Sequence, residues 1–293
     1  SLGFEFVSIR EPEIQDWFKR KVEHESSDFR PSHEERKRIL MKLNEAVVFE
    51  NFLHTKYIGQ KRFSLEGGET TIPALDMIVN KGAELGVEEV VIGMAHRGRL
   101  NVLTNTMGKT YEEVFNEFEG AALPDETMGD GDVKYHLGFS TQINALGGQQ
   151  VNMNLLPNPS HLEAVDPVVM GYARAKIDNI YKNDSTRVLP ILIHGDAALA
   201  GQGLVYETIQ MSNLPAYHCG GTIHFVINNQ VGFTTDFEEA RSSIYSTDVS
   251  QLIEAPELHV NGDDPEAVAF AVKLAVEFRQ KFNRDIFVDM VCY

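Results

Sequence analysis

The sequence predicts an α/β domain whose helices flank a mostly parallel β-sheet. The stretch 188–233 carries an apolar run, a helix-like segment and a second apolar run, and a polar cluster follows each apolar run. Two further short apolar runs, 89–94 and 286–291, each adjoin a segment of helical period. Strands that alternate with helices in this way are typical of a parallel sheet with helical crossovers.

The length and charge of the chain limit the kinds of partner that it suits. Its 293 residues suffice for one large α/β domain, or two smaller ones, with a substantial buried core. The formal charge of -17 argues against nucleic acid and against an anionic membrane surface, because both select basic surfaces. No apolar run approaches the roughly 18 to 20 residues that span a bilayer. We therefore expect neither nucleic acid nor a membrane as the main partner.

The cysteine content indicates a reducing compartment. Cys219 and Cys292 are the only cysteines, so the sequence contains neither a disulfide framework nor a CxxC metal motif. The N-terminus also lacks the basic and then apolar pattern of a signal peptide. These observations define the compartment no further than as a reducing one.

The first 60 residues read as a helical lead-in to the α/β domain, which we expect to occupy 61–293. Apolar residues recur at helical spacing from Glu11 to Val22, and Pro12 suits a first helical turn. Ser32 and Glu35 form a capping-box pattern that opens a second helix. The expected apolar stripe of this second helix consists of Ile39, Leu40, Leu43, Val47 and Leu53.

The next segment places basic residues at the end of a predicted strand. Pro73 is expected to open a helix that Gly86 ends, and Glu89 to Met94 reads as a short buried strand. His96, Arg97 and Arg99 follow, just before a helical period that begins at Leu100. The free backbone N–H groups of a helix start favour an anion at such a junction. A surface helix start with solvated arginines fits the pattern equally well.

Residues 119–150 form a long segment rich in glycine and acidic residues. A connection of this length is typical of a functional or mobile loop. It contains His136, which by itself reads as a structural or exposed histidine. The stretch 151–155 then alternates apolar and amide residues, which predicts a strand with one polar face. Ser160 and Glu163 form another capping-box pattern, so Ser160 by itself reads as the cap of a helix.

The central unit predicts a metal site. Roughly 30 residues separate Asp196 from Asn229, as in one strand–helix–strand crossover, and a right-handed crossover would bring the two strand ends together. A carboxylate, an amide oxygen and a loop carbonyl are ligands that Mg²⁺ prefers, commonly together with substrate phosphates. Gly-Asp and Asn-Asn are also frequent residue pairs in loops and turns. The sequence pattern therefore leaves open the alternative that these pairs bind no metal.

Common catalytic and nucleotide motifs do not occur in the sequence. Gly201-Gln202-Gly203 lacks the third glycine of a dinucleotide fingerprint, and no P-loop, HExxH or GxSxG pattern is present.

The last part of the chain is predicted to contain a helix at 264–278 and a strand at 286–291, whereas the stretch 234–257 shows no readable pattern. The chain stops at Tyr293 directly after this strand, from which we expect an excised domain.

Several longer strings together resemble the decarboxylating components of 2-oxoglutarate dehydrogenases, which use thiamine diphosphate. The strings are KRFSLEGGE, GMAHRGRLNVL, GDVKYHLGF, NPSHLEAVDPVV, HGDAALAGQG, INNQVGFTT and HVNGDDPEAV. The resemblance runs from about residue 40 to Tyr293 and implies a thiamine-diphosphate-binding fold. Ala197 stands where the general thiamine-diphosphate motif has glycine, and the 2-oxoglutarate branch commonly carries alanine there.

The resemblance also implies roles for individual residues. It implies that Mg²⁺ is held by Asp196, Asn229 and the carbonyl of Val231. It implies that the diphosphate and its surroundings are lined by Arg97, Ser160, Leu162 and Ala197. His96 and His136 match the family histidines that meet the 2-oxo acid, near its carboxylates and reacting carbonyl.

The reaction implied is the oxidative decarboxylation of 2-oxoglutarate, with transfer of the succinyl group to a lipoyl group on the succinyltransferase component. In such enzymes a pyrimidine-binding domain of a second subunit completes the site and carries the glutamate that activates the cofactor. The resemblance therefore implies a homodimer, and a chain of 293 residues that is inactive alone. Two alternatives stay open: the same chemistry on 2-oxoadipate, and a noncatalytic cofactor-binding module.

Overall fold

The computed structural model describes residues 2–25, 31–60, 62–119, 136–232 and 235–293. Its main feature is an eight-stranded sheet in the order β1-β9-β10-β6-β5-β2-β4-β3. The six inner strands run parallel, and the edge strands β1 and β3 are antiparallel to their neighbours. The strands are β1 (Leu2–Glu5), β2 (Glu89–Met94), β3 (Phe139–Asn144), β4 (Gln150–Leu155), β5 (Val188–Gly195), β6 (Ile223–Asn228), β9 (Glu257–Asn261) and β10 (Ile286–Val291). This arrangement confirms the predicted α/β class.

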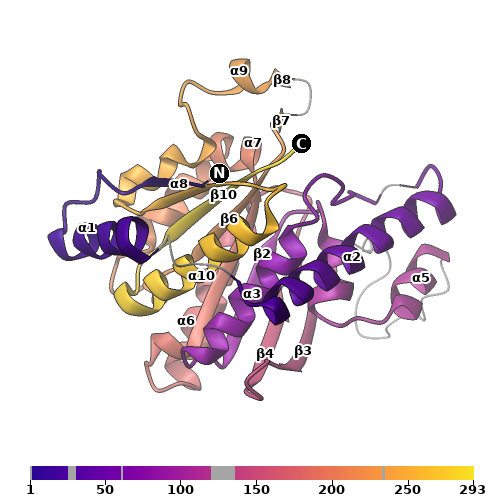
Figure 1. Cartoon of the computed structure of the whole chain (residues 1–293), viewed down its shortest axis with the longest axis horizontal. Coiled ribbons are helices and arrows are strands. Elements are labelled where there is room, and N and C mark those ends of the chain that lie inside the picture. The colour runs from indigo at the N-terminus through magenta and orange to yellow at the C-terminus, as the bar shows by residue number, and fades with distance from the viewer. Residues whose placement is uncertain (1, 26–30, 61, 120–135, 233–234) are drawn as a thin grey trace.

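Helices cover both faces of this sheet, with α3 and α10 in front of it and α6 behind it in Figure 1. The α-helices are α1 (Pro12–Lys19), α2 (His33–Lys56), α3 (Thr71–Glu84), α4 (Arg99–Asn101), α5 (Tyr111–Glu119), α6 (Asp166–Asn179), α7 (Asp196–Gly201), α8 (Gly203–Met211), α9 (Phe237–Ala240) and α10 (Pro265–Phe282). Two π-helical segments follow α1 (Arg20–Glu25) and α4 (Val102–Thr106), and 3₁₀ helices occupy Ser185–Arg187 and Ser246–Ile253. No helix of the described residues is long and apolar enough to cross a membrane.

The inner strands are buried on both faces, which explains why they read as continuous apolar runs. In β2, Val90 and Ile92 join the core beneath α3 and α10, whereas Val91 packs into the core beneath α6. In β10, Val288 enters the first core and Phe287 enters a third one, formed with α7 and α8. Successive side chains of a strand point to opposite faces, so each strand ties two helical layers together.

The lead-in contains the two predicted helices and an additional strand. The capping box of Ser32 and Glu35 is present at the start of α2, as predicted. The strand β1 was not predicted, and it pairs with β9 at the edge of the main sheet. The division of the chain at residue 60 stays a prediction.

The buried face of α2 differs from the expected apolar stripe. The helix packs against α3 through a face with Ile39, Ala46, Phe49 and Leu53, all of which are buried. Leu40 is 66% exposed and Val47 is 36% exposed, so their assignment to the stripe was wrong. An apolar residue beside the contact face is not covered, because only one side of α2 faces the domain.

The helix after β4 begins later than its capping pattern predicted. No helix starts at Ser160; α6 begins at Asp166, with Pro167 in its first turn. The Glu163 side chain binds His194 instead of the backbone near Ser160, and Glu163 has a positive φ of 67°. The prediction that Ser160 caps a helix was therefore wrong, because a tertiary contact takes the glutamate that the capping box requires.

Candidate functional site

The candidate site residues follow the carboxyl ends of neighbouring parallel strands. His96 and Arg97 follow β2, Asp196 follows β5, and Asn229 follows β6. These three strands are adjacent, and their ends lie almost level, because Met94 pairs with Ile193 and Gly195 pairs with Ile227. Ligands of open parallel sheets bind at this edge. The structure therefore brings the three predicted junctions together.

Asp196 is the first residue of α7 and is 2% exposed. Burial raises the pKa of its carboxyl, and the charge of Arg241 opposes this rise. Arg241 Nη1 lies 3.7 Å from Asp196 Oδ2. A buried carboxylate whose nearest cationic partner among the described residues is a guanidinium 3.7 Å away suits a bound cation. Sequence pattern missed Arg241, which lies in the stretch that showed no readable pattern.

The segment after β6 forms a tight turn beside α7. Gln230 has a positive φ of 59°, and the Asn229 Oδ1 atom accepts a hydrogen bond of 3.4 Å from the Val231 N–H. Val231 and Gly232 form β7, which pairs with β8 (Thr235–Asp236) and contacts α7. A Cβ atom added to Gly232 would lie 3.7 Å from the Cβ of Ala197. The structure thus places Asp196, Ala197, Asn229 and Val231 in neighbouring segments, as predicted.

The oxygen atoms of this region fit the chemistry of Mg²⁺. Asp196 supplies a carboxylate and Asn229 supplies an amide oxygen, and both are hard ligands. The preceding residue, Asn228, is held by its Nδ2 atom, which donates to Asp289 Oδ1 at 2.9 Å. Within the described part of the chain, the buried Asn228 Oδ1 atom has no hydrogen-bond partner. The metal roles of Asp196, Asn229 and Val231 stay predictions.

His96 and His136 lie together although they come from separate segments. Their ring centroids are 5.0 Å apart, and the ring centroid of Phe63 lies 5.1 Å from that of His96. Burial lowers the pKa of His96, and the nearby His136 and Arg99 lower it further. At neutral pH, His96 is therefore an uncharged hydrogen-bonding group. The residues 132–135 that precede His136 lie outside the described residues.

The two arginines after β2 have different surroundings. Arg97 is exposed, and its Nη1 atom donates to the Ser64 carbonyl at 3.2 Å. Arg99 is fully buried, and its Nη2 atom donates to the carbonyls of Leu137 at 2.7 Å and Leu156 at 2.6 Å. Burial lowers the pKa of Arg99 to about 10. The expectation that both arginines are available to an anion was wrong for Arg99, which instead binds the backbone next to His136.

Ser160 and Leu162 lie in the exposed turn between β4 and α6. The side chain of Leu162 is 40% exposed. β4 is the neighbour of β2, so this turn follows the same edge of the sheet as Arg97 and Asp196. The predicted contact of both residues with a diphosphate stays a prediction.

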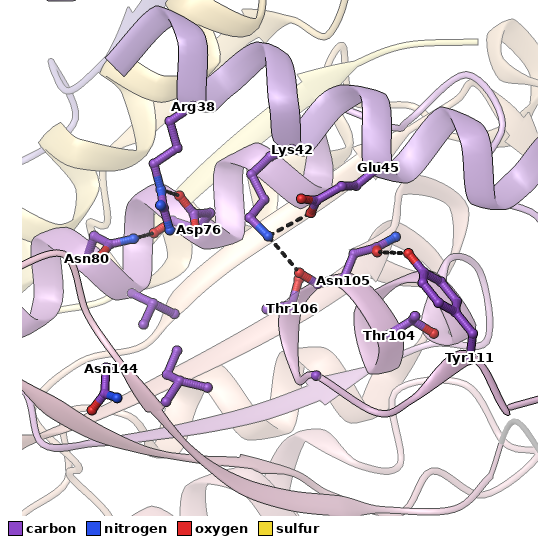
Figure 2. A pocket seen from close by; sticks show the side chains of 13 residues that line it. Arg38, Lys42, Glu45, Asp76, Asn80, Thr104, Asn105, Thr106, Tyr111 and Asn144 are labelled. Carbon is purple, nitrogen blue, oxygen red and sulfur yellow. Dashed lines mark hydrogen bonds and ion pairs between the residues drawn. The ribbon is translucent and has the colours of Figure 1, made fainter. Parts of the chain in front are cut away.

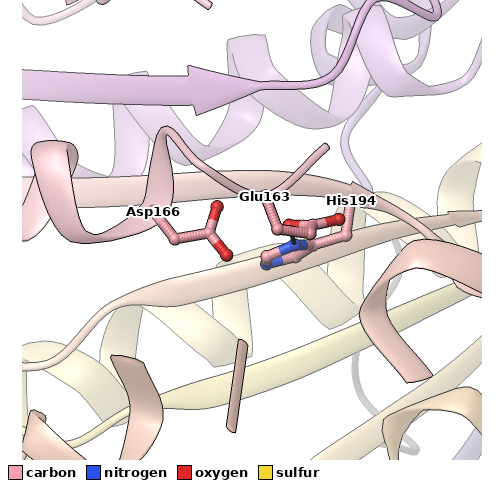
Figure 3. Close-up of side chains that lie close together, drawn as sticks. All are labelled: Glu163, Asp166 and His194. Carbon is pink, nitrogen blue, oxygen red and sulfur yellow. Dashed lines mark hydrogen bonds and ion pairs between the residues drawn. The ribbon is translucent and has the colours of Figure 1, made fainter. Parts of the chain in front are cut away.

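A buried polar cluster behind the edge was not predicted. The His194 Nδ1 atom lies 2.6 Å from Glu163 Oε2, and the His194 Nε2 atom lies 3.0 Å from His224 Nδ1. The His224 Nε2 atom in turn lies 3.3 Å from Asp285 Oδ2. Figure 3 shows the side chains of Glu163 and His194 next to each other, with Asp166 to one side. A histidine inside each of two apolar strands was the one signal in the sequence that pointed to this cluster.

The cluster is explained by hydrogen bonds without a metal ion. Glu163, Asp166 and His194 offer ligand atoms within 4.8 Å of one another. Burial and the charge of Glu163 raise the pKa of Asp166. Burial would raise the pKa of Glu163 as well, but the charge and hydrogen bond of His194 outweigh it, so that this pKa is lowered. Both nitrogens of His194 already face partners, Glu163 and His224, so His194 has no ring nitrogen left for a metal ion.

A polar pocket of about 440 Å³ lies away from these residues, between α2, α3 and the π-helical segment after α4 (Figure 2). Arg38 binds both carboxylate oxygens of Asp76, at 2.6 and 2.7 Å, and Lys42 binds Glu45 at 2.7 Å. Because these charges are paired within the pocket, it offers no uncompensated group for an ionic ligand. None of the predicted site residues lines it.

Comparison with known proteins identifies relatives over the whole chain. A multifunctional 2-oxoglutarate metabolism enzyme from Mycolicibacterium vanbaalenii is 54% identical over 100% of this chain and 24% of its own length. A 2-oxoglutarate dehydrogenase E1 component from Brucella canis is 50% identical over 100% of this chain and 30% of its own length. The chain thus spans about a quarter to a third of the curated relatives that it matches.

The family comparison agrees with the fold and with the position of the candidate site. The family model described as dehydrogenase E1 component matches residues 41–293, which include every candidate site residue. The eight-stranded, mostly parallel sheet flanked by helices is consistent with such a domain. The chain therefore belongs to the dehydrogenase E1 component family.

Proposed function

We propose that this chain binds the diphosphate end of thiamine diphosphate with Mg²⁺, within a protein that oxidatively decarboxylates 2-oxoglutarate. Membership of the family implies thiamine diphosphate as the cofactor. The observation that carries the proposal is the buried Asp196 at the start of α7, beside the turn that contains Asn229. Both lie at the sheet edge that also bears Arg97 and the His96–His136 pair.

The cation would be held by oxygen ligands from two adjacent βα units. Asp196 would contribute a carboxylate, Asn229 an amide oxygen and Val231 a backbone carbonyl. Arg97 would supply positive charge toward the diphosphate, with Ala197, Ser160 and Leu162 around it. The small Ala197 side chain suits this position, because β7 lies close to α7 there.

The chemistry that thiamine diphosphate supplies when bound is a nucleophilic carbon and an electron sink for the loss of carbon dioxide. The chain itself would position the substrate. His96 would hydrogen-bond the 2-oxo acid in its uncharged form, which its lowered pKa favours. His136, 5.0 Å from His96 between ring centroids, would contact the same substrate. The exposed Arg97 adds positive charge where the substrate and cofactor are both anionic.

The partners proposed for the whole protein follow from the relatives' names and from the resemblance. The succinyl group would pass to a lipoyl group on the succinyltransferase component. A pyrimidine-binding domain of a second subunit would carry the glutamate that activates the cofactor, so the whole protein would be a homodimer. We propose a cytoplasmic location for a bacterial protein and a mitochondrial matrix location for a eukaryotic one.

The proposal is tested by calorimetric titration of the full-length protein with thiamine diphosphate in the presence of Mg²⁺. Asp196→Ala is expected to abolish Mg²⁺-dependent binding, because it removes the buried carboxylate of the site. Asp178→Ala, which removes an exposed carboxylate of α6, is the control and should bind as the wild type does. Unchanged affinity in Asp196→Ala would refute the metal assignment.

The substrate is tested by comparing turnover of 2-oxoglutarate and of 2-oxoadipate by the full-length protein. We expect the higher kcat/KM for 2-oxoglutarate. A higher value for 2-oxoadipate would assign the longer acid. Turnover of neither acid by a protein that binds the cofactor would favour the noncatalytic cofactor-binding module.

A further inference from the structure

Arg241 is a charged residue at the candidate site to which no role has yet been given. It follows α9, in the segment that comes after the β7–β8 hairpin (Figure 1). Its guanidinium reaches back to the start of α7, where its Nη1 atom lies 3.7 Å from Asp196 Oδ2. Residues from two distant segments thus meet at the carboxylate that is proposed to hold the cation.

The two charges are buried together. The side chain of Arg241 is 11% exposed and that of Asp196 is 3% exposed. Among the described residues, Asp196 is the only acidic group at ion-pair distance from Arg241. The Arg241 Nε atom is buried and has no hydrogen-bond partner within the same part of the chain. The guanidinium therefore neutralises Asp196 without the close, paired hydrogen bonds that arginine forms with a carboxylate in a permanent ion pair.

We propose that Arg241 is the counter-ion of Asp196 in the cofactor-free protein and competes with Mg²⁺ for this carboxylate. The inference rests on the proposed function, since it takes Asp196 as a metal ligand. A divalent cation bound to Asp196 would lie within a few ångströms of the guanidinium, and two positive groups repel strongly in a buried site. Cation binding therefore requires that the guanidinium move away from Asp196.

The competition has two measurable consequences. Removing the charge of Arg241 leaves Asp196 as an unpaired buried carboxylate, which destabilises the cofactor-free protein. The same change removes the group that the cation must displace, so that cation binding becomes tighter. If Arg241 instead helped to hold the diphosphate, the change in affinity would have the opposite sign, because removal of Arg241 would weaken cofactor binding.

The test uses the full-length protein as wild type, Arg241→Gln and Arg241→Lys. Mn²⁺ binding is measured by electron paramagnetic resonance without cofactor, and Mg²⁺ binding by calorimetry at a fixed concentration of thiamine diphosphate. Arg241→Gln is expected to bind both metals more tightly, on the order of 10-fold. Arg241→Lys keeps a positive charge on a side chain of different shape. Its affinity for both metals should lie between that of Arg241→Gln and that of the wild type.

Thermal unfolding supplies the second measurement. The unfolding midpoint of Arg241→Gln should fall in the cofactor-free protein and return toward the wild-type value at saturating Mg²⁺ and thiamine diphosphate. Arg36→Gln is the matched control, because it removes an exposed arginine paired with Glu266 at 3.1 Å, far from Asp196 in the chain. It should change neither the metal affinity nor the difference between the two midpoints.

The outcomes separate the inference from the proposed function. If the wild type binds the metals but Arg241→Gln binds them equally or more weakly, the competition is refuted while the metal site stands. If the wild type binds neither metal, the proposed function fails and the inference fails with it. If Arg241→Gln does not fold, tighter binding by Arg241→Lys than by the wild type supports the competition, and equal or weaker binding overturns it.

Discussion

His96 and His136 come from different segments of the chain, and their contact with each other makes both candidates for substrate binding. Their ring centroids lie 5.0 Å apart, and the pKa of His96 is lowered by burial and by the neighbouring charges. Arg99 contributes to this arrangement, since its Nη2 atom donates to the carbonyl of Leu137, the residue after His136. His136 by itself read as a structural or exposed histidine, and its neighbour makes it a candidate for substrate contact.

The role of His136 predicts a loss of turnover without a loss of cofactor. In the full-length protein, His136→Ala should lower kcat/KM for 2-oxoglutarate by about 100-fold or more, as expected for a positioned hydrogen-bonding group. The affinity for thiamine diphosphate should stay at the wild-type value in calorimetry. His33→Ala, an exposed histidine at the start of α2, serves as the control. Steady-state constants that match the wild type would show that His136 does not contact the substrate.

Among single residues of the site, Asp196 and Arg241 differ in how far sequence could predict them. Asp196 follows an apolar run and precedes a helix, and this local pattern was enough to place it at a strand end. The position of Arg241 depends on the path of the chain after β8, which no periodicity describes. The predicted capping box of Ser160 and Glu163 also failed because of tertiary structure: Glu163 binds His194, which is distant in the chain, and not the backbone near Ser160.

At the scale of elements, the inner strands were predicted well and the outer ones were not. β2 and β10 have the predicted bounds, because strands buried on both faces read as apolar runs. β1, β3 and β9 were missed: β3 has a sequence of mixed polarity, FSTQIN, and β1 has only four residues. Such strands at or near the sheet edges are defined by the neighbour that they pair with, so their own residues give a weak signal.

A polar connection between three strands supports the turn that contains Asn229. His259 of β9 binds Asp289 of β10, with 2.9 Å between His259 Nδ1 and Asp289 Oδ2. Asp289 in turn accepts a hydrogen bond from Asn228 at the end of β6. Burial would lower the pKa of His259, but the hydrogen bond and charge of Asp289 outweigh it, so that this pKa is raised above the ordinary value.

This connection predicts a pH-dependent stability. A histidine whose pKa is raised in the folded state stabilises the fold fully below its unfolded pKa of about 6.5, and this contribution is lost as the pH rises through the folded pKa. His259→Gln should therefore destabilise the protein by about 1 to 3 kcal/mol at pH 6 and by less at pH 9. Thermal unfolding midpoints at both pH values measure the difference. An equal loss at both values would show that the charge of His259 contributes nothing.

For the whole molecule, the net negative charge disfavours the anionic ligands of the proposed site. The chain carries -17, so an anionic cofactor and an anionic substrate must be met by local positive groups. Arg97, which is exposed, is the proposed positive group at this edge of the sheet, while Arg241 lies against Asp196. We expect binding of thiamine diphosphate to depend on Mg²⁺ for this reason, since the cation compensates both Asp196 and the diphosphate.

The proposed function places part of the active site in a second domain. The chain spans 24% and 30% of two relatives that it matches. The candidate residues at the sheet edge are proposed to contact the diphosphate, the cation and the substrate. The glutamate that activates the cofactor is proposed to come from another domain.

The purified 293-residue chain should therefore give no detectable decarboxylation of 2-oxoglutarate with Mg²⁺ and thiamine diphosphate, whereas the full-length protein should turn it over. Carbon dioxide release by both polypeptides measures this, with the Asp196→Ala full-length protein as the inactive reference. Turnover by the chain alone, above that reference, would show that activation of the cofactor requires no further domain.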